Sequence, residues 1–188
     1  MFGARIVDWV DADDGKGQLG AEDFDYLALA PPYRSADRPM TTISELRLIL
    51  EMNAETLRKL TPHVSALPDP AAPLNVNTAT APVLAALVPN LTAEAAEGLV
   101  STRDSGGPWE SVTDFLQEPA LAGSGLSATG LGVQSGYFRV SVRARFLDRF
   151  AYLTSIVQRN PVDGSMRVFY RDMSKKISPA VTSESGDG

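Results

Sequence analysis

The residues most able to do chemistry in this chain form one acidic run near its start. Seven carboxylates lie between residues 8 and 26, opposed only by Lys16, and they are Asp8, Asp11, Asp13, Asp14, Glu22, Asp23 and Asp25. Like charges at this density repel one another, so a fold must leave them in water or neutralise them with a cation. Hard divalent cations prefer oxygen ligands, and Ca²⁺ takes about six to eight of them from flexible loops. The run therefore indicates either a calcium loop or a solvated acidic loop.

The spacing of the carboxylates favours calcium. With Asp11 as position one, Asp13 is position three and Glu22 is position twelve, as in an EF-hand loop. Gly15 stands at position five and Lys16 at position six, where a glycine is expected, so the loop has some other geometry. The predicted metal ligands are Asp11, Asp13, Asp14, Glu22 and Asp23. Asp8 and Asp25 flank the glycine-rich part and are weaker candidates.

The sequence contains few of the residues and motifs that enzymes use for catalysis. The single histidine, His63, lies between Pro62 and Val64 in a proline-rich connector, where a structural role is more common than catalysis. There is no cysteine, no Gly-x-Ser-x-Gly, no Gly-x-Gly-x-x-Gly and no phosphate-binding loop. A general acid also needs an apolar pocket, which an acidic glycine-rich run does not predict. We therefore expect no catalytic activity.

The charge is distributed unevenly over the 188 residues. Residues 1 to 37 carry eight acidic and three basic side chains, and residues 139 to 176 carry nine basic and three acidic ones. The formal net charge of −6 argues against a generally basic nucleic-acid binder. No apolar run approaches the ~20 residues that span a bilayer, and no signal peptide is visible at the start.

The periodicity changes from helix to strand along the chain. Helices are expected over 4–10, 41–50, 53–60, from 74–78 onward with Thr78 as N-cap, over 92–103, and over 111–116. The glycine-rich stretch 123–136 is expected to be a flexible link. Alternation of apolar and polar residues then predicts an antiparallel meander of strands over 137–146, 150–159 and 166–171. The predicted domains are 1–135, helical with the acidic loop, 136–177, the strands, and 178–188, a disordered tail.

One helical segment resembles the helix-hairpin-helix repeats of competence-type DNA-binding proteins. The segment runs from Asn75-Val-Asn-Thr-Ala79 through Leu87 and then from Thr92 to Arg103. Its hairpin, residues 88–91, lacks the Gly-x-Gly that presents backbone N–H groups to phosphate, and the region is net negative. The likeness is therefore taken as one of fold, described as helix-hairpin-helix or SAM-like. A DNA-binding module is kept as the alternative function.

The order of the motifs resembles the GspK family, the large minor pseudopilins of bacterial type II secretion systems. The likeness runs from about residue 5 to 173. It rests on Asp8-Trp-Val-Asp-Ala-Asp-Asp14, Gly20-Ala-Glu-Asp23 with Tyr26, Pro32-Tyr-Arg34, Ser44-Glu-Leu-Arg-Leu48, Leu60-Thr-Pro62, Ala66-Leu-Pro68, Asn75-Val-Asn-Thr-Ala79 and the terminal strands. Asp37 departs from the asparagine usual in the family.

The resemblance implies an α+β fold in which a helical domain is inserted in a pilin-like antiparallel sheet. It implies calcium bound by acidic residues, and a structural role at the tip of the periplasmic pseudopilus. The implied partners are the minor pseudopilins I and J, with secreted substrates as further candidates and no nucleic acid. The family is anchored in the inner membrane by an N-terminal apolar helix. That helix and the first strands are expected to be absent from this chain.

Overall fold

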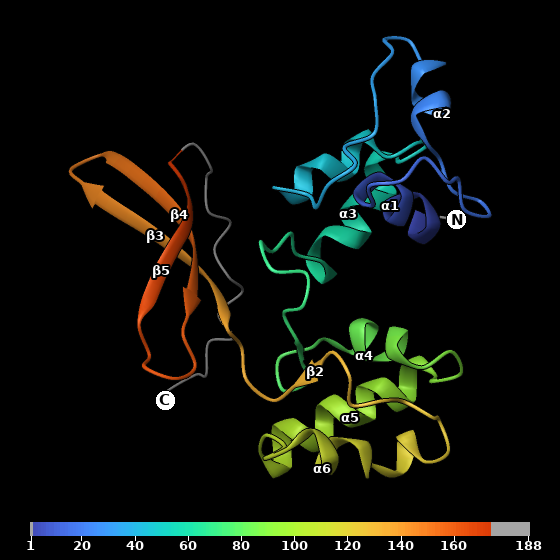
Figure 1. Ribbon diagram of the computed structural model, residues 1–188. Coiled ribbons are helices and arrows are strands. Elements are labelled where there is room, and N and C mark those ends of the chain that lie inside the picture. The colour runs from blue at the N-terminus through green and yellow to red at the C-terminus, as the bar shows by residue number, and fades with distance from the viewer. Residues whose placement is uncertain (1, 174–188) are drawn as a thin grey trace. The chain divides into compact units, whose positions relative to one another are not determined.

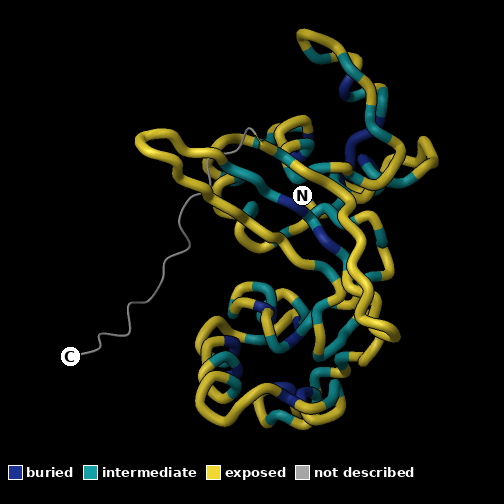
Figure 2. Tube along the Cα trace, turned by 90° about the vertical axis from the view of Figure 1, so that its left-hand side faces the viewer, coloured by how far each residue is buried: buried dark blue, intermediate teal, exposed yellow. Residues whose placement is uncertain are grey.

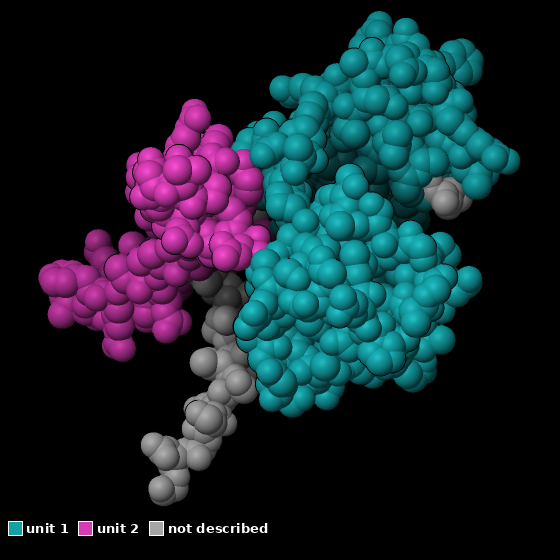
Figure 3. All heavy atoms as spheres, turned by 60° about the horizontal axis from the view of Figure 1, so that its bottom comes forward, with its two compact units in different colours: residues 1–133 teal, residues 134–188 magenta. Residues whose placement is uncertain are grey.

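The computed structural model describes residues 2–173 and divides the chain into two compact units, residues 1–133 and 134–188 (Figure 3). The predicted domain boundary after residue 135 lies close to this division. The predicted disordered tail, 178–188, lies outside the described residues. Among the helices of the described part, none has the length and apolar character needed to cross a membrane.

The first unit begins with a small helical cluster around the acidic run (Figure 1). Its helices are α1 (Phe2–Val10), α2 (Asp23–Leu27) and α3 (Ala54–Leu60), with short 3-10 helices at Ile43–Leu48 and Thr61–His63. Trp9 and Tyr26 are buried and meet edge to face at 5.1 Å, and they pack with buried Leu46 and Ile49. The acidic run therefore connects two helices, α1 and α2, that share one aromatic core.

The second cluster of the same unit is built on α4 (Ala81–Leu87), α5 (Ala93–Gly106) and α6 (Val112–Leu116), followed by a 3-10 turn at Pro119–Leu121. Thr92 and Ser111 cap α5 and α6 by accepting backbone N–H groups. The core is apolar and includes Leu84, Leu99 and Phe115. Two short parallel strands, β1 (Leu74–Asn75) and β2 (Leu131–Gly132), close the cluster.

Three sequence-based predictions in this unit are wrong. The stretch 41–50 holds only the 3-10 helix Ile43–Leu48, because Ile49 leaves the helical region with ψ of 131° and places its buried side chain in the core. The stretch 74–78 is strand and turn, and Thr80 is the N-cap instead of Thr78. Pro82 explains this, since a helix starting at Thr78 would place a residue without N–H beyond the first turn.

The third correction concerns the glycine-rich stretch 123–136, in which residues 126–133 are packed against the second cluster and do not form a flexible link. Leu74 N–H donates to the carbonyl of Gly130 at 2.8 Å, and Val76 N–H donates to that of Gly132 at 2.9 Å. Leu131 and Val133 also pack against the core of the second cluster. The apolar residues between the glycines therefore fix this stretch, although the glycine and serine content suggested otherwise.

The second unit is the predicted antiparallel meander, with strand order β3-β4-β5. The strands are β3 (Tyr137–Phe146), β4 (Arg149–Arg159) and β5 (Met166–Asp172), with an irregularity in the β4–β5 register at Ile156/Val157. Long stretches of these strands are exposed, whereas Ser155 and Val157 are buried (Figure 2). The observed fold is thus mixed helix and antiparallel sheet.

Candidate functional site

The acidic cluster is organised by the end of α1, which carries Asp8 and is followed directly by Asp11. Asp11 N–H donates to the carbonyl of Val7 at 3.0 Å, and the charge of Asp8 acts on the Asp11 carboxyl. Asp8 is buried, and its Oδ2 accepts the N–H of Gly17 at 3.1 Å. A Cβ at Gly20 would lie 1.8 Å from the same oxygen, so only glycine allows the loop to pass this close to Asp8.

Glu22 is the most unusual carboxylate of the cluster. The residue is 5% exposed, and both carboxylate oxygens are buried without a hydrogen-bond partner. Burial, together with the charges of Asp8, Asp11, Asp37 and Asp13, raises its pKa to about 7. A buried carboxylate without a donor is costly when ionised, so this position needs either a proton or a cation.

Asp11 and Asp37 complete the surroundings of Glu22. Asp11 Oδ1 is also buried without a partner, and burial and the charges of Asp13, Asp8 and Asp37 raise the pKa of this carboxyl. Asp37 has a positive φ of 50°, and its N–H donates to the carbonyl of Trp9 at 3.2 Å. The fold therefore brings together carboxylates from α1, from the start of α2 and from the connector that follows α2.

The other predicted ligands have different surroundings. Asp23 Oδ1 accepts the N–H and the hydroxyl of Ser35, both at 2.9 Å, and Oδ2 accepts from Arg34, so the pKa of Asp23 is lowered chiefly by Ser35. Asp13 is exposed, and its Oδ1 accepts the N–H of Gly15 at 2.8 Å. Asp14 is exposed.

The weaker candidate Asp25 is committed to local contacts. It accepts from Lys16 Nζ at 2.8 Å and from the N–H of Glu22 at 3.0 Å, and its pKa is lowered chiefly by the bond from Lys16. Asp25 thereby holds the start of α2 in place, next to the unpartnered carboxylate of Glu22.

Asp8 was a weaker candidate in the sequence-based prediction, and Asp37 was not among the predicted ligands. The spacing of three positions between Asp8, near the end of α1, and Asp11, directly after it, was a usable signal. Nothing in the sequence placed Asp37 near them, because it lies fifteen positions after Glu22. Within residues 2–173, no group of three or more His, Cys, Asp or Glu side chains is arranged so that it could hold a metal ion as it stands.

The Asn75–Ala79 motif has an internal structural role. Asn77 Nδ2 donates to the carbonyls of Trp109, at 2.9 Å, and Val133, at 3.1 Å, and its Oδ1 accepts the N–H of Trp109 at 2.9 Å. Arg103, at the end of α5, donates to the carbonyls of Val76 and Ala79. These polar groups are thus directed into the fold and are not presented to a phosphate backbone.

His63, the single histidine, lies near Thr80. Its Nδ1 is 3.1 Å from Thr80 Oγ1, next to the N-cap of α4, and the residue is exposed. This single contact with a hydroxyl at the start of a helix indicates a structural role for His63.

The comparisons with known proteins agree across the chain. Two family models described as type II secretion system (T2SS), protein K, match residues 2–69 and residues 74–134, the segments that form the two helical clusters. The protein K of Pseudomonas aeruginosa is 42% identical over 184 residues, which are 97% of this chain and 54% of the relative. The chain belongs to the type II secretion system protein K family. The protein K of Klebsiella pneumoniae is 43% identical over 122 residues, 63% of this chain and 37% of the relative.

A solved structure supports the same family. The crystal structure of the GspK-GspI-GspJ complex from enterotoxigenic Escherichia coli matches with a TM-score of 0.76 at 27% identity. The match covers 92% of this chain and 62% of that chain. The resemblance to the GspK family is therefore confirmed. The chain spans about half the length of the curated protein K relatives it matches.

Proposed function

We propose that this chain is part of a structural minor pseudopilin at the tip of the type II secretion pseudopilus, where it assembles with the minor pseudopilins I and J and supports protein export across the outer membrane. The observation that carries the proposal is the structural match, at a TM-score of 0.76, to a solved chain in a complex of GspK, GspI and GspJ. Membership of the protein K family supports it independently. The complete protein would reside in the periplasm, anchored in the inner membrane, and would have no catalytic role.

Co-purification tests this assembly. The chain would be mixed with the periplasmic parts of the I and J proteins from the same organism, and the mass of the product measured by light scattering during size-exclusion chromatography. We expect a complex that contains one copy of each protein. Separate elution of the chain from an intact I–J pair, at micromolar concentrations, would contradict the proposal.

The proposal includes a calcium ion held by the acidic cluster. Its ligands would be drawn from Asp8, Asp11, Glu22 and Asp37, with Asp13 at the edge. The buried, unpartnered oxygens of Glu22 and Asp11 support this assignment, because a cation would satisfy them and cancel the repulsion among the carboxylates. Two ligands predicted from the sequence are left out of this set: Ser35 and Arg34 occupy both oxygens of Asp23, and Asp14 is exposed.

Calcium titration of two matched variants tests this ligand set. Glu22→Gln removes a charge from the centre of the cluster, and Asp14→Asn removes one from an exposed position of the same loop. We expect Glu22→Gln to weaken calcium binding by at least about tenfold and Asp14→Asn by less than about threefold, since ligand charge sets the affinity of such sites. Equal losses would show that only the net charge of the loop matters.

The helix pair α4–α5 is included in the proposal as a helix-hairpin-helix-like element with a structural role. Asn77 and Arg103 form hydrogen bonds inside the fold, and this supports a structural role over DNA binding. A gel-shift experiment at low salt with duplex DNA is expected to show no complex. A complex that is lost on raising the salt would favour the DNA-binding alternative.

A further inference from the structure

One face of the sheet carries a row of arginines beside aromatic rings. Arg139, Arg143 and Arg145 alternate along β3, and residues that lie opposite each other on antiparallel strands share a face. Tyr152 lies opposite Arg143, and Phe150 lies opposite Arg145. The guanidinium carbons of Arg143 and Arg145 each lie 5.7 Å from the centre of the Phe150 ring. The Phe150 ring therefore holds both of these guanidinium groups at the surface.

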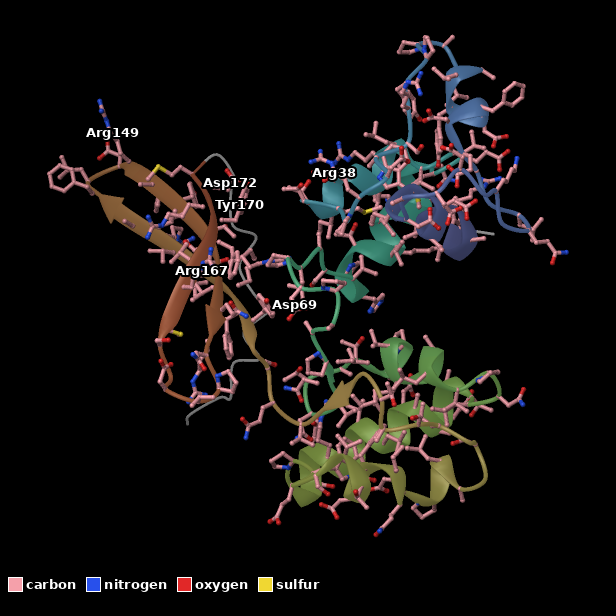
Figure 4. All side chains as sticks on the ribbon, in the orientation of Figure 1. Arg38, Asp69, Arg149, Arg167, Tyr170 and Asp172 are labelled. Carbon is pink, nitrogen blue, oxygen red and sulfur yellow. The ribbon has the colours of Figure 1, made fainter. Side chains whose placement is uncertain are left out.

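The same face continues onto β5. Arg167 lies 4.7 Å from the centre of the Phe169 ring, and that ring is 6.1 Å from the ring of Tyr137 on β3. Phe150, Phe169 and Tyr170 remain 48%, 37% and 42% exposed. Figure 4 shows Arg167 on the body of the sheet and Tyr170 and Asp172 further along β5. We call this surface, defined by Arg139, Arg143, Arg145, Phe150, Tyr152, Arg167 and Phe169, the arginine face.

The arginine face is not neutralised within the described part of its unit. Residues 134–173 contain seven arginines and three aspartates. In that range, no carboxylate forms an ion pair with Arg139, Arg143, Arg145 or Arg167. The register places Asp172 on this face, but on β5, which β4 separates from β3. The guanidinium groups along β3 are therefore available to an anionic partner.

The spacing of the arginines indicates the form of that partner. Alternate residues on a strand are about 6.8 Å apart, and an extended peptide repeats at the same distance. Carboxylates at alternate positions of such a peptide would meet Arg143 and Arg145, and a further one would reach Arg139. We propose that the arginine face binds an extended acidic segment of a partner protein, with its carboxylates at alternating positions along β3.

The charge of the rest of the chain favours a short protein segment over nucleic acid. Residues 1–133 carry eighteen acidic and eight basic side chains, so the first unit repels a long polyanion. Duplex DNA carries one charge per about 1.7 Å, far denser than the arginine row. A segment as long as β3 requires only the arginine face and avoids most of this repulsion.

The test uses the complete 188-residue chain, labelled with ¹⁵N, and an eight-residue peptide in which glutamate alternates with threonine. A peptide of the same composition with its four glutamates contiguous is the control ligand. Arg143→Gln with Arg145→Gln removes two charges from the arginine face. Arg159→Gln with Arg171→Gln removes two from the opposite face, where the register pairs them with Met166 and Ser155. Thermal unfolding checks that both variants fold.

We expect the alternating peptide to shift the amide signals of β3 and β4 and to bind more tightly than the contiguous one. The arginine-face variant should weaken binding by about tenfold and the opposite-face variant by less than about twofold, since exposed ion pairs are individually weak. Equal weakening in the two variants, preference for the contiguous peptide, absence of any shift, or tighter binding of an oligothymidylate would each overturn the proposal.

Discussion

At the scale of single residues, Gly20 is the position of the acidic cluster that tolerates least change. A Cβ there would meet the carboxylate of Asp8, which is itself buried, at 1.8 Å. Gly20→Ala is expected to lower the free energy of unfolding by about 1–3 kcal/mol, as overpacking does in a filled interior. Urea denaturation followed by circular dichroism measures the change.

The control for this substitution is Gly98→Ala. Gly98 lies exposed within α5, and a Cβ there would meet nothing within 4 Å. Alanine should therefore raise the free energy of unfolding by about 0.5–1 kcal/mol, because glycine is unfavourable within a helix. Equal effects at the two positions would contradict the close approach of the loop to Asp8.

Glu22 makes the stability of the cation-free protein depend on pH in an unusual direction. Its carboxyl has an ordinary pKa of 4.5, which the fold raises to about 7, so the folded state binds the proton more tightly than the unfolded state. The contribution of Glu22 is therefore fully favourable below about pH 4.5 and is lost as the pH rises through 7. Asp11, whose pKa is also raised, contributes with the same sign.

The expected result in a chelator is a higher urea midpoint at about pH 5 than at about pH 8. Glu22→Gln should flatten this difference, since the amide cannot ionise. Asp23 and Asp25, whose pKa values are lowered, act in the opposite direction and only at more acidic pH. A midpoint in the unmodified chain that rises steadily from pH 5 to pH 8 would refute the environment described for Glu22.

At the scale of elements, Asn77 joins segments that are distant in sequence. Its amide bonds to Trp109, before α6, and to Val133, after β2. Asn77→Ala leaves two carbonyls and one N–H without their partner, so we expect a loss of about 2–4 kcal/mol in the stability of the first unit. Asn53→Ala, which removes only the cap of α3, should cost about 1 kcal/mol. Denaturation curves in which the two variants coincide would argue against this role.

The elements also show what sequence can and cannot predict. The strands β3, β4 and β5 were predicted from the alternation that is clearest in β3 and from the Asp163-Gly164 turn signal, and α5 was predicted over 92–103 because Thr92 caps its start, whereas the helix continues to Gly106. The 3-10 helix at Ile43–Leu48 and the pairing of β1 with β2 were missed. Both depend on tertiary contacts. The 3-10 helix ends where the side chain of Ile49 is buried, and β1 pairs with a strand that lies more than fifty residues later in the chain. Such contacts leave no pattern in the local sequence from which they could be predicted.

At the scale of the whole molecule, the family could be recognised from motif order, whereas the candidate site was only partly predictable. Asp11, Asp13 and Glu22 followed from EF-hand-like spacing. Asp37 reaches the cluster through the path of the connector after α2, and Asp23 is diverted to Ser35 and Arg34. The two helical clusters coincide with the segments matched by the two protein K family models. The arginine face was visible in the sequence only as alternating arginines.

The most direct test of whether a cation binds the acidic cluster is thermal unfolding of the complete chain. The unfolding temperature would be measured in EDTA, in millimolar Ca²⁺ and in millimolar Mg²⁺. A cation at about one hundred times its dissociation constant stabilises the folded state by about 2.7 kcal/mol, which corresponds to a rise of roughly 5–10 °C for a protein of this size. We predict such a rise with Ca²⁺, little change with Mg²⁺, and a clearly smaller rise with Ca²⁺ in Glu22→Gln. An unfolding temperature that is the same in all three solutions would contradict a calcium site and leave the acidic run as a solvated loop.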